Sequence, residues 1–199
     1  MTVAGLLLAA GAGRRMGGPK ALLELEGEPL VCRGIRLLAE GGCDPVVVVV
    51  GAAADRVREL CEGAEVVEAA GWDTGMGASL RAGLARLGGE TVVSGAVVAL
   101  VDQPLVTVAV LDRLHAAHGA GAVAAVATYD GRPRNPVLLA RSTWQGVSAA
   151  ATGDEGARGW LRAHPDLVVQ VDCTGVGAPD DLDTPLDLTR MTDPKVEAR

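Results

Sequence analysis

The sequence predicts a three-layer α/β protein with a doubly wound, mostly parallel sheet between two layers of helices. Apolar runs of strand length recur along the chain, and most are apolar on both faces, as in strands that helices cover on both sides. Segments with apolar residues at helical spacing separate these runs, so strands and helices alternate. The 199 residues are 49% hydrophobic, which is enough for a core of Leu, Val and Ala.

Six segments are predicted as strands because they are short and almost entirely apolar. In chain order they are Val3–Ala10, Pro45–Gly51, Glu65–Ala69, Ala96–Val101, Ala122–Thr128 and Leu167–Val171. Three sets of apolar residues predict helices between them: Leu30, Val31, Gly34, Ile35 and Leu38; Met76, Leu80, Leu84 and Leu87; and Val110, Leu111 and Leu114. No repeat or linker divides the chain. We therefore expect a single domain over residues 1–191 and a frayed, charged tail over 192–199.

Charge and cysteine content limit the kinds of partner. A net charge of −7 argues against nucleic-acid binding, which needs a basic face. No cation precedes the first apolar stretch, and no run approaches the ~20 apolar residues of a membrane span. The four cysteines, which form no CxxC pair, are typical of a reducing compartment, and we expect inert, partly buried thiols. These features predict a cytoplasmic protein without a membrane partner.

Three loops that follow predicted strands are candidates for a ligand site. In open parallel sheets the ligand crevice lies beyond the carboxyl ends of the strands. The loops are Gly11–Lys20, Asp102–Pro104 and Asp180–Pro185. Chemistry is therefore expected where these three segments meet.

The first loop has the composition of a phosphate-binding turn. It combines four glycines with three cations, so backbone N–H groups and positive charge can both face a polyphosphate. The glycines at 11, 13 and 17 give GxGxxxG, and the next long strand ends in Gly51 without a carboxylate for a ribose, so a hydride-transfer enzyme is the weaker alternative. Ala21 follows Lys20, which excludes a Walker P-loop. Arg15 and Lys20 remain as candidate phosphate ligands, and we expect Lys20 on an exposed loop.

Two aspartates are candidate ligands of a divalent cation. Asp102 directly follows a strand, and Asp183 precedes Thr184-Pro185. Mg²⁺ prefers few carboxylates together with water and phosphate oxygens, so two carboxylates on separate loops suit it. Each residue has an equally good structural interpretation, as a turn residue or as the cap of a following helix.

The remaining motifs are less decisive. Gly75–Arg81 opens a helix with small residues, and its free N–H groups either face a substrate or simply begin the helix. His115 and His118 are expected to be solvated surface histidines, because no third ligand lies in register. No serine or cysteine nucleophile motif appears.

Taken in order along the chain, these motifs resemble the nucleotidyltransferases of the molybdenum cofactor, most closely the cytidylyltransferase branch. The resemblance spans nearly the whole sequence. Its carriers are Leu8–Lys20, Gly75–Leu84, Asp102–Val106, Gly153–Arg158 and Asp181–Pro185.

The resemblance implies a Rossmann-like fold, a nucleoside triphosphate substrate and transfer of CMP or GMP to the phosphate of molybdopterin or its Mo-bound form, with release of pyrophosphate. It implies that Lys20, Arg15 and Asp102 form the catalytic set and that Asp102 and Asp183 hold Mg²⁺, with Mn²⁺ as an alternative. The implied nucleotide-binding residues are Leu8, Ala9, Ala10, Gly11, Gly13, Arg15, Gly17, Lys20 and Ser79. The implied acceptor-binding residues are Asn135, Pro136, Asp154 and Arg158. A molybdoenzyme or its chaperone is the implied downstream partner.

One departure from the family pattern concerns the acceptor. Cytidylyltransferases of this type usually carry Gly-His-Pro before a strand, whereas this chain has Arg134-Asn135-Pro136. An asparagine cannot titrate, so any proton-handling role of the histidine is absent. Two alternatives therefore stay open: the same chemistry on another small phosphorylated metabolite, and a non-catalytic module that binds nucleotide and cofactor.

Overall fold

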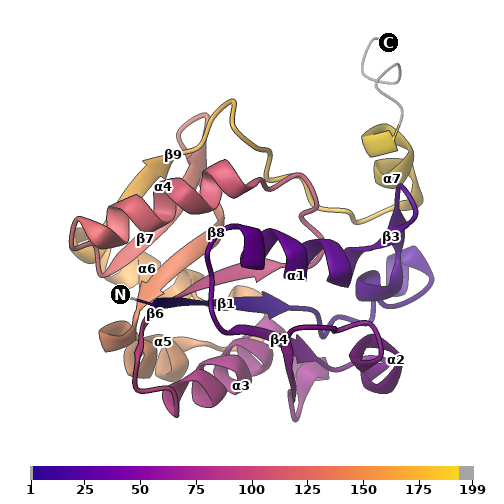
Figure 1. Cartoon of the computed structure of the whole chain (residues 1–199), viewed down its shortest axis with the longest axis horizontal. Coiled ribbons are helices and arrows are strands. Elements are labelled where there is room, and N and C mark those ends of the chain that lie inside the picture. The colour runs from indigo at the N-terminus through magenta and orange to yellow at the C-terminus, as the bar shows by residue number, and fades with distance from the viewer. Residues whose placement is uncertain (1, 193–199) are drawn as a thin grey trace.

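The structure, a computed structural model, describes residues 2–192 and is built around one seven-stranded sheet (Figure 1). The strand order is β5-β4-β1-β6-β8-β7-β9. The strands are β1 (Thr2–Leu8), β4 (Val46–Val50), β5 (Glu65–Glu68), β6 (Val93–Leu100), β7 (Ala124–Tyr129), β8 (Arg132–Ala140) and β9 (Val168–Asp172). A separate two-stranded hairpin pairs β2 (Glu24–Leu25) with β3 (Glu28–Pro29). All neighbours in the large sheet are parallel except those of β8, which runs antiparallel to both β6 and β7.

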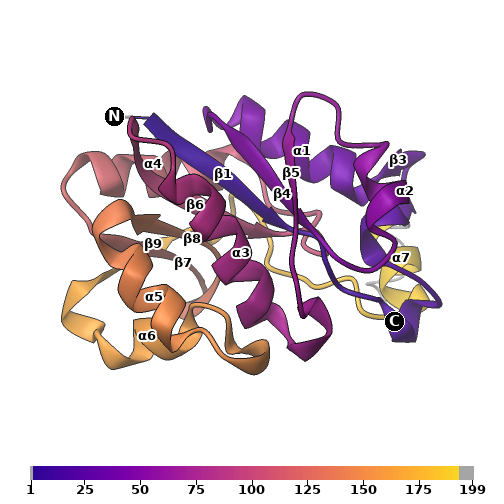
Figure 2. The same cartoon turned by 90° about the horizontal axis from the view of Figure 1, so that it is seen from below.

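Helices cover both faces of the sheet, which confirms the predicted three-layer α/β fold (Figures 1 and 2). On one face lie α1 (Leu30–Glu40) and α4 (Val108–Gly119); on the other lie α3 (Met76–Gly88), α5 (Trp144–Ala150) and α6 (Arg158–Ala163). The short α2 (Ala54–Arg58) and the C-terminal α7 (Pro185–Thr192) lie near the carboxyl end of β1. The 3₁₀ turns are η1 (Arg14–Met16), η2 (Lys20–Leu22), η3 (Trp72–Thr74), η4 (Arg141–Thr143), η5 (Gly153–Glu155) and η6 (Pro165–Leu167).

The core is divided by the sheet into two apolar clusters. All five valines of β4 are buried, because this strand is covered on both faces. In β1, Leu7 packs in the cluster under α1 and α4, while Leu6 and Leu8 pack in the cluster under α3, α5 and α6. Side chains that alternate between the faces of a strand therefore belong to different cores.

Each of the six predicted strands corresponds to an observed one with small shifts at its ends, but β8 was not predicted as a paired strand. Its first half, Arg132–Asn135, is polar and contains Pro133, which argued against a strand. The structure tolerates this proline because it pairs only with β7, whereas the ladder with β6 begins at Val137. A hairpin signal was present: Asp130 and Gly131 both have positive φ and form the two-residue turn between β7 and β8.

The prediction that both histidines are solvated is wrong. His118 is only 8% exposed and follows Leu111 and Leu114 along the inner face of α4. Its Nδ1 lies 3.1 Å from the carbonyl oxygen of Ala122 and its Nε2 lies 3.1 Å from Ser94 Oγ. His115 is half-buried, and burial lowers its pKa. The spacing of Leu111, Leu114 and His118 marks one helix face and would have shown that His118 points inward.

Three other predictions concern the cysteines, the tail and membrane association. The four cysteines are free thiols, and Cys43, Cys61 and Cys173 are buried, which confirms the expected burial. Burial raises the pKa of Cys43 to about 12 and of Cys61 to about 11, which favours the unreactive protonated thiol. Of the predicted frayed tail, Thr192 ends α7, and residues 193–199 lie outside the described part of the chain. Within residues 2–192, none of the helices has the length and apolar character needed to span a bilayer.

Candidate active site

A polar cavity of about 360 Å³ opens where β1 and β6, adjacent parallel strands, end. The loop after β1 and the turn after β6 supply much of its lining, as the crevice rule for parallel sheets predicts. The start of α3 and residues near it supply the rest. The lining residues are Leu8, Ala10, Gly11, Ala12, Gly13, Arg14, Lys20, Trp72, Asp73, Gly75, Met76, Ser79, Leu100, Val101, Asp102 and Asp154.

At this cavity one lysine bridges two carboxylates that are far apart in sequence. Lys20 Nζ donates to Asp102 Oδ2 at 2.8 Å and to Asp183 Oδ1 at 2.6 Å. The Lys20 side chain is 17% exposed, so the expectation that it lies free on an exposed loop is wrong. The structure thus brings together the phosphate-binding candidate and both metal-binding candidates.

The electrostatics of this cluster favour a charged lysine. Burial alone would lower the pKa of Lys20, but the hydrogen bonds and charges of Asp102 and Asp183 outweigh it and raise that pKa above its usual value. The two carboxylates share one cation, so their oxygens already surround a positively charged position. Two carboxylate ligands match Mg²⁺ or Mn²⁺ chemistry, with water and phosphate oxygens completing the shell. Within residues 2–192 no group of three acidic, histidine or cysteine side chains could hold a metal by itself.

Asp183 is not part of the cavity lining, and it contacts Lys20 from a strap, residues 176–183, that is bonded to the turn after β6. Leu182 N donates to Asp102 O at 2.8 Å, and Ala178 N donates to Leu105 O at 3.2 Å. Gln103 Nε2 donates to Pro179 O and to Asp181 Oδ1. Burial raises the pKa of Asp181, although the Gln103 hydrogen bond opposes this. These bonds fix Asp183 beside Asp102, a contact that sequence spacing alone could not give.

The glycine loop after β1 folds back on itself and needs glycine at one position in particular. Gly13 has φ of 57°, and its carbonyl accepts from Met16 N at 2.8 Å and from Gly18 N at 3.3 Å. A Cβ at Gly13 would stand 1.9 Å from Gly18 O, so no other residue fits without moving the loop. Gly17 also has a positive φ, but a Cβ there would meet open space.

The loop presents a different arginine from the one that the sequence suggested. Both arginines are exposed, but Arg14 lines the cavity and Arg15 does not. Both belong to the single turn η1, in which neighbouring side chains point in different directions. Ala9 and Gly17 are likewise absent from the lining, and Ala9 packs instead in the core under α1.

The start of α3 and the Gly153–Arg158 segment, recognised separately in the sequence, lie against each other. A Cβ at Gly75 would stand 2.5 Å from Gly153 O and 2.8 Å from Asp154 Oδ1. A Cβ at Gly77 would stand 2.8 Å from the carbonyl carbon of Ala151. Glycines at the helix start therefore allow close backbone contact, which places Ser79 and Asp154 on the same cavity.

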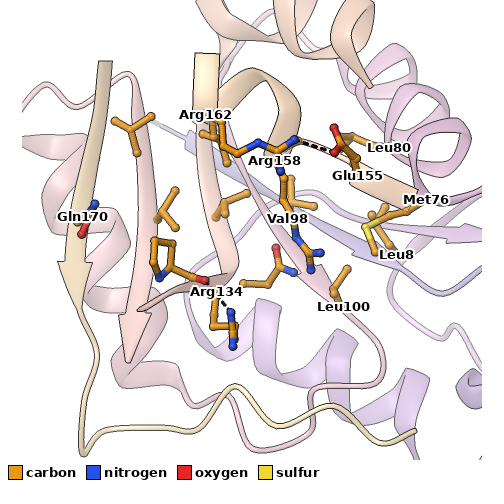
Figure 3. A pocket seen from close by; sticks show the side chains of 18 of the residues that line it. Leu8, Met76, Leu80, Val98, Leu100, Arg134, Glu155, Arg158, Arg162 and Gln170 are labelled. Carbon is orange, nitrogen blue, oxygen red and sulfur yellow. Dashed lines mark hydrogen bonds and ion pairs between the residues drawn. The ribbon is translucent and has the colours of Figure 1, made fainter. Parts of the chain in front are cut away.

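A second cavity, of about 420 Å³, adjoins the polar one and has mostly aliphatic walls (Figure 3). The two cavities share Leu8, Met76 and Leu100. Asn135 and Arg158, two of the predicted acceptor-binding residues, line the second cavity. Pro136 does not: it lies on the opposite face of β8, among residues of β1, α1 and the turn after β6, because side chains alternate along a strand. Asp154 lines the polar cavity instead.

Comparison with known proteins agrees with this geometry. A family model described as MobA-like NTP transferase domain matches residues 5–168. The chain belongs to this family. It is therefore a member of a nucleotidyltransferase family, which confirms the family resemblance found in the sequence.

Three proteins are similar to this chain over almost its whole length. Nicotine blue oxidoreductase of Paenarthrobacter nicotinovorans is 38% identical over 95% of this chain and 96% of its own. Molybdenum cofactor guanylyltransferase of Rhodobacter capsulatus is 34% identical over 97% and 96%. Rv0371c of Mycobacterium tuberculosis, solved as a complex with manganese, is 28% identical over 96% and 98%, with a TM-score of 0.80. Nucleotidyltransferases of this kind use a divalent metal ion.

Proposed function

We propose that this protein transfers CMP or GMP from a nucleoside triphosphate to the phosphate of molybdopterin, or of its Mo-bound form, and releases pyrophosphate. The observation that carries the proposal is the meeting of Lys20, Asp102 and Asp183 beside the glycine loop, next to a second cavity that an acceptor can enter. The names of the relatives favour a molybdenum cofactor substrate, and one named guanylyltransferase favours GTP, whereas the sequence motifs favour CTP. Both triphosphates therefore belong in the test.

In the proposed reaction an oxygen of the acceptor phosphate forms a bond to the α-phosphorus. The bond from the α-phosphorus to the bridging oxygen breaks, and its electron pair leaves with pyrophosphate. A phosphate nucleophile is already anionic at neutral pH, so no general base is required, and Asn135 in place of a titratable histidine is compatible with the reaction. The chain must instead offset the repulsion between the anions.

Lys20 and Arg14 would supply fixed positive charge to the triphosphate, and backbone N–H groups of the glycine loop would orient it. Asp102 and Asp183 would hold Mg²⁺, with Mn²⁺ as the alternative, and the ion would neutralise charge on the phosphate oxygens. In the structure Lys20 takes the cation's place between these carboxylates. Binding of metal and triphosphate would free the ammonium group to contact phosphate.

The direct test measures pyrophosphate release by the full-length protein with Mg²⁺, each of the four nucleoside triphosphates and molybdopterin. We expect release with CTP or GTP only when metal and acceptor are both present. A thermal-shift panel of the four triphosphates, with and without Mg²⁺ or Mn²⁺, supplies a readout that does not depend on turnover. Nucleotide binding without release for any pair would instead favour the non-catalytic module that delivers cofactor to a molybdoenzyme or its chaperone. Release with another phosphorylated metabolite would keep the chemistry and change the acceptor.

A second candidate activity rests on the relative named an oxidoreductase, which is 38% identical along almost the whole chain. This reading predicts that NADH or NADPH raises the melting temperature and that triphosphates do not. The glycine loop argues against it, because the dinucleotide fingerprint is imperfect and β4 is followed by Gly51, with no carboxylate for the ribose. Stabilisation by triphosphate alone would exclude it.

A further inference from the structure

The second cavity has a composition that distinguishes between classes of acceptor. It lies between the sheet and the helices α3 and α6. Its walls are mostly aliphatic and come from five strands and two helices: Leu8, Leu80, Val98, Val126 and Val137 are buried, and Leu161 and Val168 are partly exposed. Leu80, Val98, Val126 and Val137 are each at most 4% exposed.

The polar side chains of this cavity lie at its rim. Arg134, Glu155, Arg158, Arg162 and Gln170 are all exposed, and Asn135 is half-buried. The interior therefore offers few partners for a ligand with many hydrogen-bonding groups. A polar group that is buried without a new hydrogen-bonding partner loses the free energy of its contacts with water, so a highly polar ring fits this interior poorly.

One cation at the rim, Arg158, has no hydrogen-bonding or ion-pair partner among residues 2–192. Arg162 Nη2 donates to Glu155 Oε1 at 2.7 Å, and Arg134 Nη1 donates to Pro133 O at 3.3 Å. In contrast, no hydrogen bond or ion pair engages the guanidinium of Arg158 within residues 2–192. Figure 3 shows Arg158 extending across the cavity toward Leu100, which also lines the polar cavity. An unpaired guanidinium above aliphatic walls suits an anion carried on an apolar body.

We propose that the second cavity binds an apolar aromatic ring system that carries a phosphate, with Arg158 contacting that phosphate at the boundary with the polar cavity. The sheet supplies a floor of aliphatic side chains against which a flat ring can lie, and Met76 supplies a polarizable sulfur contact at the shared wall. A volume of about 420 Å³ lies in the range of small-molecule sites and accommodates a fused two-ring system. This inference rests on the reaction of the proposed function and names the class of the alternative acceptor, a phosphorylated metabolite whose ring is less polar than the pterin of molybdopterin.

Titration calorimetry on the full-length protein, without nucleotide, tests the ring. The probe is 2-naphthyl phosphate, compared with cyclohexyl phosphate, inorganic phosphate and a pterin phosphate. We expect 2-naphthyl phosphate to bind at least about 10-fold more tightly than each of the other three. A pterin phosphate that binds as tightly as the naphthyl compound, or more tightly, would overturn the proposal.

Substitutions test the position. Arg158→Gln should lower the affinity for 2-naphthyl phosphate about 10-fold. The affinity for 2-naphthol, which lacks the phosphate, should change by no more than about 2-fold. Arg162→Gln on the same helix is the matched control and should change neither ligand by more than about 2-fold, since Arg162 is already paired. Leu161→Trp, which fills the cavity from a partly exposed position, should weaken both ligands by about 10-fold or more.

Binding of the probe in the polar cavity would change the affinities of a different set of variants. If the phosphate of the probe sat in the glycine loop, Arg14→Gln would weaken 2-naphthyl phosphate and Arg158→Gln would not, which would overturn the inference. The pyrophosphate assay reports on the proposed function separately. If 2-naphthyl phosphate binds as expected but no pyrophosphate is released, the proposed nucleotidyl transfer is wrong and the proposed ligand class stands. If the protein releases pyrophosphate with a pterin phosphate but does not bind 2-naphthyl phosphate, the nucleotidyl transfer stands and the ligand class is wrong.

Discussion

The two adjoining cavities are built in different ways. The polar cavity is formed mainly by loops and turns that follow strands, and its charged residues are Arg14, Lys20, Asp73, Asp102 and Asp154. The apolar cavity is formed largely by side chains of the sheet face and of α3 and α6. A substitution in the loops can change the charges of the polar cavity without disturbing the sheet. A substitution in the sheet face changes the apolar cavity and the packing of the core together. The comparison suggests that reaction chemistry depends on the first cavity and acceptor choice on the second.

The largest effect is expected from Asp102→Asn. It keeps the shape of the side chain but removes half of the carboxylate pair that is proposed to hold the metal, so the rate of pyrophosphate release should fall by roughly 10²–10⁴. Binding of 2-naphthyl phosphate should stay unchanged if the cavities act separately. Melting curves with nucleotide, with and without Mg²⁺, check the metal assignment: a full metal effect in the variant would falsify it.

Leu80→Ala tests the other side of the comparison. Leu80 is 1% exposed and contributes to the wall of the apolar cavity and to the core beneath α3. Removing its side chain should lower the free energy of unfolding by about 2–4 kcal/mol, measured by urea denaturation. Triphosphate affinity should change less than about 3-fold. A large loss of nucleotide affinity would mean that the shared wall couples the two cavities.

Gly13→Ala should damage the polar cavity without loosening the core. The added Cβ would collide with Gly18 O, so the loop must refold, and we expect triphosphate affinity to fall about 10–100-fold. Gly17→Ala is the matched control, because its φ is also positive but its Cβ would meet open space. Calorimetry should show only a small loss there. Equal losses at both positions would indicate that positive φ, and not the close contact with Gly18, sets the loop.

Substituting each of the two neighbouring arginines in turn tests which one binds the triphosphate: Arg14, which the structure favours, or Arg15, which the sequence motif favours. Arg14→Gln should weaken triphosphate binding about 10-fold, since Arg14 lines the cavity, and Arg15→Gln less than about 3-fold. The reverse order would restore the motif-based assignment and would require the turn η1 to rotate when nucleotide binds.

The smallest effect is expected at His115. This residue lines neither cavity, so its substitution shows how much a change outside both of them alters stability. Burial lowers its pKa; Asp112 opposes this and His118 adds to it, and Cys43 Sγ lies 3.7 Å from its Nε2. As pH falls through about 6.5, the unfolded chain binds a proton that the folded state resists, so stability should decrease with acidification and level off below the folded pKa. His115→Gln should remove this contribution and so flatten the change of Tm with pH on the acid side. An unchanged pH profile in the variant would contradict the assignment.

Much of the fold was predictable because its signals are local. Continuous apolar runs such as Val46–Val50 identify buried strands, and residues such as Met76, Leu80 and Leu84 identify the inner face of α3. β8 escaped this reasoning because its prolines and charges resemble a loop, and only its partners explain why they are tolerated. Its hairpin turn, Asp130-Gly131, was a local signal that had not been used.

The candidate site was predictable as a set of loops but not as a geometry. Placing the segments after β1 and β6 at one edge follows from parallel pairing, and this brings Lys20 close to Asp102. That Arg14 faces the cavity and Arg15 does not depends on the rotation of one short turn. That Asp183 completes the cluster depends on the strap of residues 176–183, which has no periodic pattern and is held by hydrogen bonds to the segment Asp102–Thr107.

The position of Asp183 has a practical consequence for anyone who trims the protein. The family match ends at residue 168, fifteen positions before this carboxylate. A fragment cut at that boundary would keep the glycine loop and Asp102 but would lose β9 and leave Lys20 with a single acidic partner. Loss of activity in such a fragment would therefore report on the missing strand and strap, Asp183 included, and would say nothing about the chemistry of the part that was kept.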